Sequence, residues 1–208
     1  MPQSTRDRIL DAAAAVVLRA GTKGLTTKAI AAEAGLTEPA LYTYFENKDA
    51  LCVATASERV PCPKELADRI RGRVGEETVL DTLRDLAVDL LRYYLASVPF
   101  EMMFWADPRL REIDRGPARA QGLLPGAVDD YLRGEQQRGR IPTDAPTRAV
   151  AHGIVGALFR QAFIVSFNET TLACEEASPL LDEVVRLAAA ALRLGPDGLA
   201  DQGCAAAG

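Results

Sequence analysis

Apolar residues recur along most of the chain at intervals of three and four positions, the spacing that collects them on one face of an α-helix. Over residues 4–20 this stripe consists of Ile9, Ala12, Ala13, Val16, Val17 and Ala20. No segment alternates regularly enough between apolar and polar residues to indicate a β-strand. We therefore predict an all-α protein whose first helix ends at Gly21.

Two short helices separated by a tight turn are predicted next. Thr26 is a suitable N-cap for a helix over residues 27–34, and Gly35 ends it because glycine readily adopts the left-handed conformation. The following helix begins after Thr37 and reaches about residue 46. Such a pair is typical of a helix-turn-helix, in which the N-terminal residues of the second helix lie against base edges in the DNA major groove.

Longer helical patterns fill the rest of the chain. A fourth helix is predicted from residue 48 to 60, before Pro61 interrupts the pattern. The later helices are predicted over residues 76–97, 100–113 with a break around Pro108, 117–138, 147–167 and 176–194. The first of these is expected to stop before Pro99, because the residue that precedes a proline disfavours the helical conformation.

Composition describes a soluble globular protein. The chain has 208 residues, of which 48% are hydrophobic and 25% charged, and its length allows a small and a larger domain. The net charge is −5, yet residues 1–60 hold seven basic and seven acidic residues and are neutral. The acidic total does not exclude nucleic acid, because the local field decides binding. It does disfavour a strongly basic protein that coats DNA without regard to sequence.

The remaining chemistry excludes several classes of protein. The four cysteines have no CxxC pair, so we predict reduced thiols, no metal site and no cofactor. No uncharged stretch approaches the length that spans a bilayer, which indicates a cytoplasmic protein without membrane contact. His152 is the only histidine and no nucleophile, P-loop or dinucleotide motif is present, so we predict no enzyme. A two-carboxylate active site is left open, without a feature that indicates it.

One stretch of the chain resembles a known family. The run LTTKAIAAEAGLTEPALYTYFENKDAL over residues 25–51, preceded by TRDRILDAAAAVVLRAG over residues 5–21, is similar to the N-terminal domain of TetR family transcriptional regulators. The resemblance is specific over about the first quarter of the chain. It implies a helix-turn-helix DNA-binding domain at residues 1–47, a linking helix at 48–60, a ligand-binding and dimerisation domain at 61–194, and a flexible tail at 195–208.

The resemblance also implies the function. Such a protein is a homodimeric repressor that binds a palindromic double-stranded DNA operator and is released by a small apolar or aromatic inducer. The residues at matching positions that bind phosphates are Thr27, Tyr42 and Lys48. The residues placed to face bases are Glu38, Pro39, Ala40, Thr43 and Tyr44. Ala40 or Thr43 could touch a thymine methyl group, and Glu38 could accept from cytosine N4.

Each of these roles has a plainer alternative. Glu38 is equally suited to interact with the helix dipole, and Tyr44 could pack with a solvated hydroxyl. Leu41 and Phe45 are predicted to be core residues that hold the second helix on the first.

The second domain is less informative. A dimer interface is predicted from apolar and small residues of the last two helices, namely Ala149, Gly153, Gly156, Ala157, Leu181, Val184 and Ala188. An apolar ligand pocket is predicted from aromatic and methionine residues, namely Tyr93, Tyr94, Met102, Met103, Phe104, Trp105, Phe159 and Phe163. Both sets have the alternative of an ordinary intramolecular core.

Overall fold

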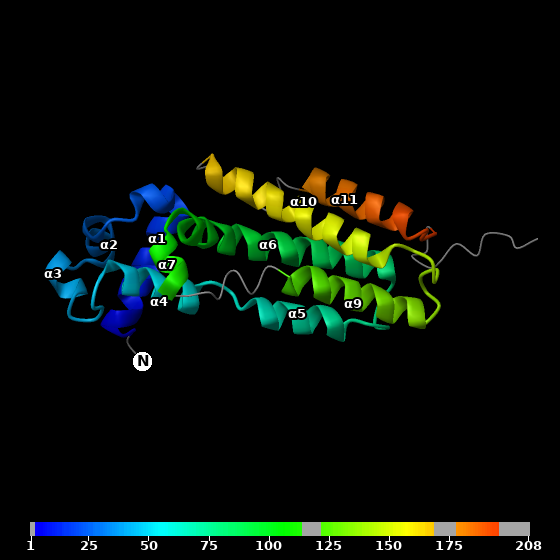
Figure 1. Cartoon of the computed structure of the whole chain (residues 1–208), viewed down its shortest axis with the longest axis horizontal. Coiled ribbons are helices and arrows are strands. Elements are labelled where there is room, and N and C mark those ends of the chain that lie inside the picture. Colours follow the sequence, from blue (N-terminus) through cyan, green and yellow to red (C-terminus); the bar gives the residue numbers. More distant parts are fainter. Residues whose placement is uncertain (1–2, 114–121, 169–177, 196–208) are drawn as a thin grey trace, which may run out of the picture. The chain divides into compact units, whose positions relative to one another are not determined.

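The computed structural model describes residues 3–113, 122–168 and 178–195, and their regular elements are helices (Figure 1). This confirms the predicted all-α class. Contacts in space between backbone positions divide the chain into two compact units, and two of the helices, α6 (Val79–Ala106) and α10 (Thr147–Phe167), contribute residues to both. Of the predicted tail over residues 195–208, all but residue 195 lie outside the described residues.

The first unit contains the N-terminal helices. They are α1 (Thr5–Gly24), α2 (Thr27–Ala34), α3 (Glu38–Leu41) and α4 (Lys48–Arg59), joined by the end of α6 and by α7 (Pro108–Ile113). α1 packs against α2 and α4, α2 against α3, and α7 against α4. The predicted stripe of α1 forms the centre of the core, where Ile9, Val16 and Val17 are buried. Gly21 has a non-helical backbone with a φ of 60°, so the regular helix is interrupted at the predicted residue.

The core of the first unit extends beyond the N-terminal helices. Phe100, Met103 and Phe104 of α6 and Leu110 of α7 belong to the same hydrophobic cluster as the buried residues of α1, α2 and α4. Cys52 of α4 lies in that cluster, and burial raises the pKa of its thiol to about 11, so the thiol stays protonated at neutral pH. The end of α6 is therefore part of the scaffold on which the N-terminal helices rest.

The second unit contains α5 (Pro63–Gly72), the first half of α6, α9 (Leu123–Gln137), most of α10, and α11 (Ser178–Ala191). α5 packs against α9. The interior also holds a polar group, since the carboxylate of Glu135 is fully buried and accepts from the backbone N–H of Gly75 at 2.9 Å and from Arg140 Nε at 2.5 Å. Arg140 in turn donates to the backbone carbonyl of Glu77 at 2.6 Å. This buried charge is thus paired, as burial requires.

Several predicted helix boundaries are wrong, two of them near prolines. α6 does not stop before Pro99 but continues through it to Ala106. A proline inside a helix forfeits one backbone hydrogen bond, and the burial of Pro99 and Phe100 holds the helix together across this point. α9 begins at Leu123, which places Pro125 in its first turn, where the missing N–H costs nothing.

α10 is the most apolar helix of the described chain. By length and composition alone it could cross a membrane, with a mean hydropathy of 1.5 over an 18-residue window, although one such helix is weak evidence. Arg148 lies near its start and Arg160 within it. Only 33% of the window is buried within the chain, so much of its apolar surface is left uncovered.

Candidate nucleic-acid interface

The turn between α2 and α3 has the geometry that the sequence predicts. The Thr26 hydroxyl caps α2 by accepting from the backbone N–H of Ala29 at 3.1 Å. At the other end Gly35 adopts the left-handed conformation, with φ 64° and ψ 37°. Its N–H donates to the carbonyl of Ala32, and the N–H of Leu36 donates to that of Ala31, the paired bonds of a Schellman motif. The direction in which α3 leaves α2 is therefore set by local residues.

α3 is shorter than predicted. Helical backbone covers Glu38–Leu41, and the chain continues as a tight turn over residues 42–44 instead of a helix to residue 46. In the turn, the N–H of Tyr44 donates to the carbonyl of Leu41 at 3.0 Å, three residues back. β-Branched and aromatic residues have lower helix propensity, which accounts for the early end. We call residues 38–44 the recognition segment.

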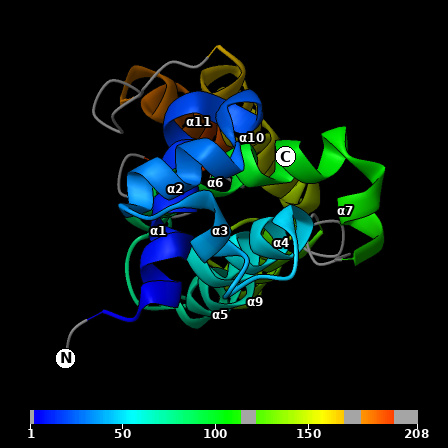
Figure 2. The ribbon, with the colours of Figure 1, turned by 90° about the vertical axis from the view of Figure 1, so that its left-hand side faces the viewer.

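Two buried side chains hold the recognition segment on the first unit. Leu41 is 1% and Phe45 6% exposed, and both belong to the core cluster, which confirms that they are core residues. The guanidinium carbon of Arg6 in α1 lies 5.4 Å from the centre of the Phe45 ring, within cation–π range. Figure 2 shows α2, α3 and α4 from the side on which the segment lies.

The other side chains of the recognition segment point to the surface. Tyr42 is 52% and Tyr44 44% exposed, which is unusual for residues of this size. Glu38, Pro39 and Thr43 are also exposed, and Ala40 is half-buried. The structure thus brings the five predicted base-facing residues together on one short element. Their contacts with bases stay predictions.

Two lysines flank this segment. Lys48 is the first residue of α4, whose N-terminus is capped by the Asn47 side chain, which accepts from the backbone N–H of Ala50 at 2.8 Å. Lys28, which the sequence pattern did not single out, follows Thr27 in the first turn of α2. Both lysines are exposed, and neither forms an ion pair within the described part of the chain. Their ammonium groups are thus available to phosphates.

A hydrogen bond joins two of the predicted DNA-contacting residues to each other. The hydroxyl of Thr27, the first residue of α2, donates to the carboxylate of Glu38, the first residue of α3, at 2.6 Å. Neither a lysine nor an arginine pairs with Glu38 among the described residues. The predicted phosphate ligand and the predicted base reader therefore contact each other in the free protein.

Most arginines of the first unit are occupied by carboxylates instead. Arg59 of α4 contacts Asp7 and Asp11 of α1, at 2.8 and 2.5 Å. Arg19 of α1 contacts Glu33 of α2 at 2.7 Å, and its guanidinium lowers the pKa of that carboxyl. These pairs join α1 to its neighbours and are at least partly exposed to solvent, so each contributes little stability.

The residues predicted to line a ligand pocket lie in different environments. Met103 and Phe104 follow the core interpretation, since both are buried in the hydrophobic cluster of the first unit. Tyr93 and Tyr94 are buried further up α6 and contact edge to face, with ring centres 5.2 Å apart. The others are half-buried or more exposed, namely Met102, Trp105, Phe159 and Phe163. Phe163 stacks on Phe167 one turn along α10.

The residues predicted to form a dimer interface also lie in different environments, some exposed and some buried within the chain. On α10, Ala149, Gly153 and Gly156 are exposed and Ala157 is half-buried. On α11 the predicted residues follow the core alternative, since Leu181, Val184 and Ala188 are buried within the single chain. The large apolar side chain of α11 that is exposed is instead Leu187, at 73%. The sequence period identified the apolar helix but not which part of its stripe the chain itself covers.

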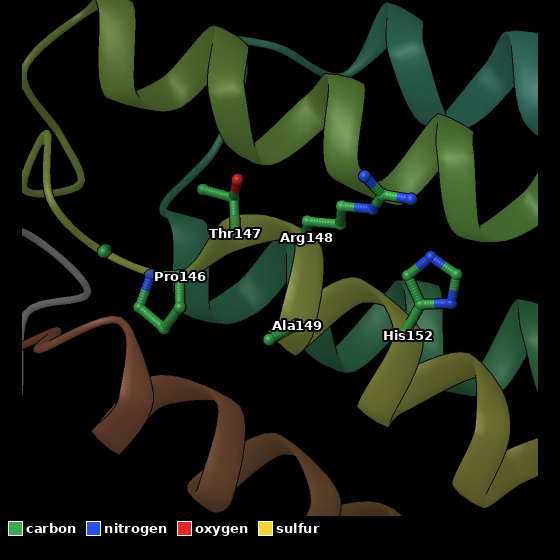
Figure 3. Close-up of a pocket in the computed structure, with 6 residues that line it drawn as sticks. Pro146, Thr147, Arg148, Ala149 and His152 are labelled. Carbon is green, nitrogen blue, oxygen red and sulfur yellow. The ribbon is translucent and has the colours of Figure 1, made fainter.

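The start of α10 borders an open surface depression of about 560 Å³ (Figure 3). It is lined by Ala145, Pro146, Thr147, Arg148, Ala149 and His152. Arg148 and His152 project from α10 next to each other, as their four-residue spacing requires. Across the described ranges, no group of three or more His, Cys, Asp or Glu side chains could hold a metal ion.

Comparison with known proteins adds independent information. Residues 9–55 match the sequence model of the family described as bacterial regulatory proteins, tetR family. YvkB of Bacillus subtilis, an uncharacterized HTH-type transcriptional regulator, is 34% identical over 149 residues, which cover 67% of this chain and 71% of that protein. The HTH-type transcriptional repressor AcnR of Corynebacterium glutamicum is 28% identical over 149 residues, covering 70% and 73% of the two chains.

A solved structure supports the fold over most of the chain. The crystal structure of the transcriptional regulator FadR from Bacillus subtilis, in complex with stearoyl-CoA, matches with a TM-score of 0.58. The two proteins are 18% identical, and the match covers 88% of this chain and 96% of that one. The likeness therefore extends beyond the N-terminal helices.

Proposed function

Because the chain belongs to the TetR family of bacterial regulatory proteins, we propose that it is a homodimeric repressor released from its operator by a small apolar or aromatic inducer. Its family and its relatives are DNA-binding transcriptional regulators, and the chain is such a regulator and not an enzyme. The name of AcnR, a repressor, supports the direction of regulation. A regulator of this kind works where the chromosome is, in the bacterial cytoplasm.

The observation that carries the proposal is the exposure of the recognition segment on a well-packed scaffold. In the proposed complex this segment enters the major groove with Glu38, Pro39, Ala40, Thr43 and Tyr44 at the base edges. The phosphates on either side are bound by Tyr42, Thr27 and Lys48. Lys28 joins them as a further cation beside Thr27.

Two glycines of α10 support the homodimer. In a helix interior, glycine costs about 1 kcal/mol relative to alanine. Packing within the single chain does not explain these glycines, because a Cβ added at Gly153 or Gly156 would meet nothing within 4 Å. A second helix that approaches α10 closely would explain both residues, because glycine allows two backbones to come near each other.

The uncovered apolar surface of α10 and α11 supports the same conclusion. Leu187 is 73% exposed, and two thirds of the apolar window of α10 lie outside the buried core. A second copy of the chain would cover both at once, and two-fold symmetry makes such an interface self-complementary. The two recognition segments would then lie about 34–36 Å apart, one turn of DNA, and read a palindromic operator.

The inducer site is proposed to include Tyr93 and Tyr94 on α6. The edge-to-face pair offers buried aromatic surface together with two hydroxyl groups. Ten residues along the same helix, Met103 and Phe104 pack in the core that supports α4. A ligand that moves this helix would therefore move α4, with a coupling free energy of about 1–3 kcal/mol between the two sites. The stearoyl-CoA bound to FadR is an example of a ligand with a long apolar part.

Selection of bound duplexes from a random DNA pool tests the proposed function directly. We expect a palindromic consensus with half-sites one helical turn apart, and its loss from the pool when an inducer is added. Acyl-CoA thioesters and aromatic acids are suitable probes. Failure to enrich any duplex at low ionic strength would overturn the proposal, and enrichment of an isolated half-site would overturn its dimeric form.

A further inference from the structure

The hydrogen bond between Thr27 and Glu38 has a consequence for DNA binding. It joins the first residues of α2 and α3 at 2.6 Å, at the surface where the proposed function places the DNA. The N-cap of α2 is the neighbouring Thr26, so the Thr27 hydroxyl is not needed to begin the helix. The bond is also not part of a larger ion-pair network, since Glu38 has no lysine or arginine partner in the described ranges.

A hydroxyl group has a single proton to donate. While Thr27 donates to Glu38 it cannot donate to a DNA phosphate. The carboxylate also brings a negative charge within hydrogen-bond distance of the oxygen that a phosphate would approach, and like charges repel at this range. Glu38 must therefore leave Thr27 before Thr27 binds a phosphate.

The released carboxylate requires a new donor. In the major groove, cytosine presents an N4 amino group that a glutamate accepts from, with no acceptor beside it on the same base. Guanine and thymine present acceptors at the corresponding edge, and adenine places the acceptor N7, which repels a carboxylate, beside its N6 amino group. Opposite a cytosine, Glu38 exchanges one hydrogen bond for another and frees Thr27. Opposite an acceptor, the carboxylate either stays on Thr27 or is left unpaired, which is costly in a desolvated interface.

We propose that Glu38 and Thr27 form a specificity device, in which the phosphate contact of Thr27 is available only when Glu38 binds the amino group of a cytosine. The device rests on the proposed placement of the recognition segment in the major groove. Beyond the proposed function, we infer that Glu38 lowers the affinity for non-operator DNA, in addition to recognising one base pair. The phosphate and base contacts of these two residues are then coupled and not additive.

A double-mutant cycle on two duplexes tests this coupling. The variants are Thr27→Val, Glu38→Ala and the double variant, with Thr27→Ser as a matched control that keeps the hydroxyl. The duplexes are the operator obtained by selection and a scrambled duplex of the same composition. With Glu38 present, Thr27→Val should weaken operator binding about 10- to 100-fold per half-site, the range of a hydrogen bond to a charged group. It should leave scrambled binding unchanged.

In the Glu38→Ala background the same change should weaken binding to both duplexes by a similar factor, because Thr27 is then free on any DNA. Glu38→Ala alone should raise affinity for the scrambled duplex. Equal effects of Thr27→Val on the two duplexes in the natural background would overturn the proposal. If Thr27→Val in the natural background had no effect on binding to either duplex, the proposal would be overturned as well.

Selection with the variants supplies a second readout. The natural protein should enrich a C·G pair at one symmetric position of each half-site, and Glu38→Ala should lose preference at that position alone. Enrichment of another base there, or an unchanged consensus, would overturn the inference. Glu38 is exposed and Thr27 half-buried, and thermal unfolding confirms that the variants fold. If the natural protein selects an operator but the cycle shows no coupling, only this inference fails; if it selects none, the proposed function itself fails.

Discussion

The chain exposes two surfaces that a solitary globular protein would not be expected to leave uncovered, and they differ in chemistry. The recognition segment presents tyrosines, a threonine and a carboxylate, with lysines on either side. The exposed small and apolar residues of α10 and α11 include Gly153, Gly156 and Leu187, and they lie among charged residues such as Arg160 and Arg186. The first surface is suited to a polar, anionic partner, and the second to another apolar surface.

The two surfaces also differ in how they are held. Within a span of about 20 residues, a capping threonine, a left-handed glycine and two buried anchors position the recognition segment. The exposed side of α10 depends on which side of the helix packs against the rest of the chain. Recognition of DNA thus depends on local structure, whereas the proposed association of two chains depends on packing between distant segments.

The largest effect is expected from removing an anchor of the recognition segment. Phe45→Ala should lower the free energy of unfolding by about 3–5 kcal/mol, because a buried aromatic ring leaves a cavity. Denaturant unfolding measures this loss. Its neighbour is the matched control, since Tyr44→Ala removes an exposed ring and should change operator affinity without changing stability. Equal stability losses for the two variants would show that the segment is not anchored as described.

Disrupting the apolar face should have the next largest effect. Leu187→Glu places a charge in the proposed interface and should convert the dimer to monomers, measured by sedimentation. Operator affinity should then fall about 10²–10⁴-fold, since two linked sites bind far more tightly than one.

The matched control is Leu18→Glu, because Leu18 is likewise exposed, at 55%, but lies on α1. Gly156→Leu offers a second variant of the interface, since the single chain has open space there. A natural protein that sediments as a monomer at micromolar concentration would contradict the assignment of this face.

A smaller effect is expected from a single phosphate ligand. Lys48→Ala should weaken binding to operator and scrambled duplexes alike, and it should lower the salt slope by about 0.9 for each phosphate that the protein no longer neutralises. Affinity measured across a salt series gives this slope. Lys64→Ala is the control, because Lys64 is also an exposed lysine at the start of a helix but lies on α5. Equal salt slopes for Lys48→Ala and Lys64→Ala would contradict the assignment of Lys48 to the DNA interface.

The smallest effect concerns stability and pH. Burial raises the pKa of Glu101 on α6 above its ordinary value of 4.5, and the nearby Ser97 hydroxyl acts in the opposite direction. The ionised carboxylate therefore opposes folding above its folded-state pKa, and this cost disappears as pH falls toward 4.5.

Glu101→Gln should accordingly raise the melting temperature by about 1–3 °C at pH 8, the shift expected for less than 1 kcal/mol in a domain of this size. The gain should shrink at lower pH. Glu112→Gln, an exposed change on α7, should show no such gain. A gain that grows on acidification would contradict the assignment.

Several features of the fold were determined by the sequence alone, because their causes are local. The cap at Thr26, the left-handed Gly35 and the stripe of α1 each depend on residues within one or two helical turns. The same holds for the exposed tyrosines, since burying Leu41 and Phe45 directs Tyr42 and Tyr44 outward. Helix-turn-helix recognition can therefore be predicted from one contiguous segment.

Other features were decided only by tertiary structure. α6 passes through Pro99 because burial of the surrounding residues outweighs the lost hydrogen bond. Apolar periodicity could not show that Met103 and Phe104 enter the core of the DNA-binding unit. Nor could it show that Leu187 is the side chain left outside while Val184 is buried. Each outcome depends on which distant segment meets the helix, and helical spacing alone contains no information about that partner.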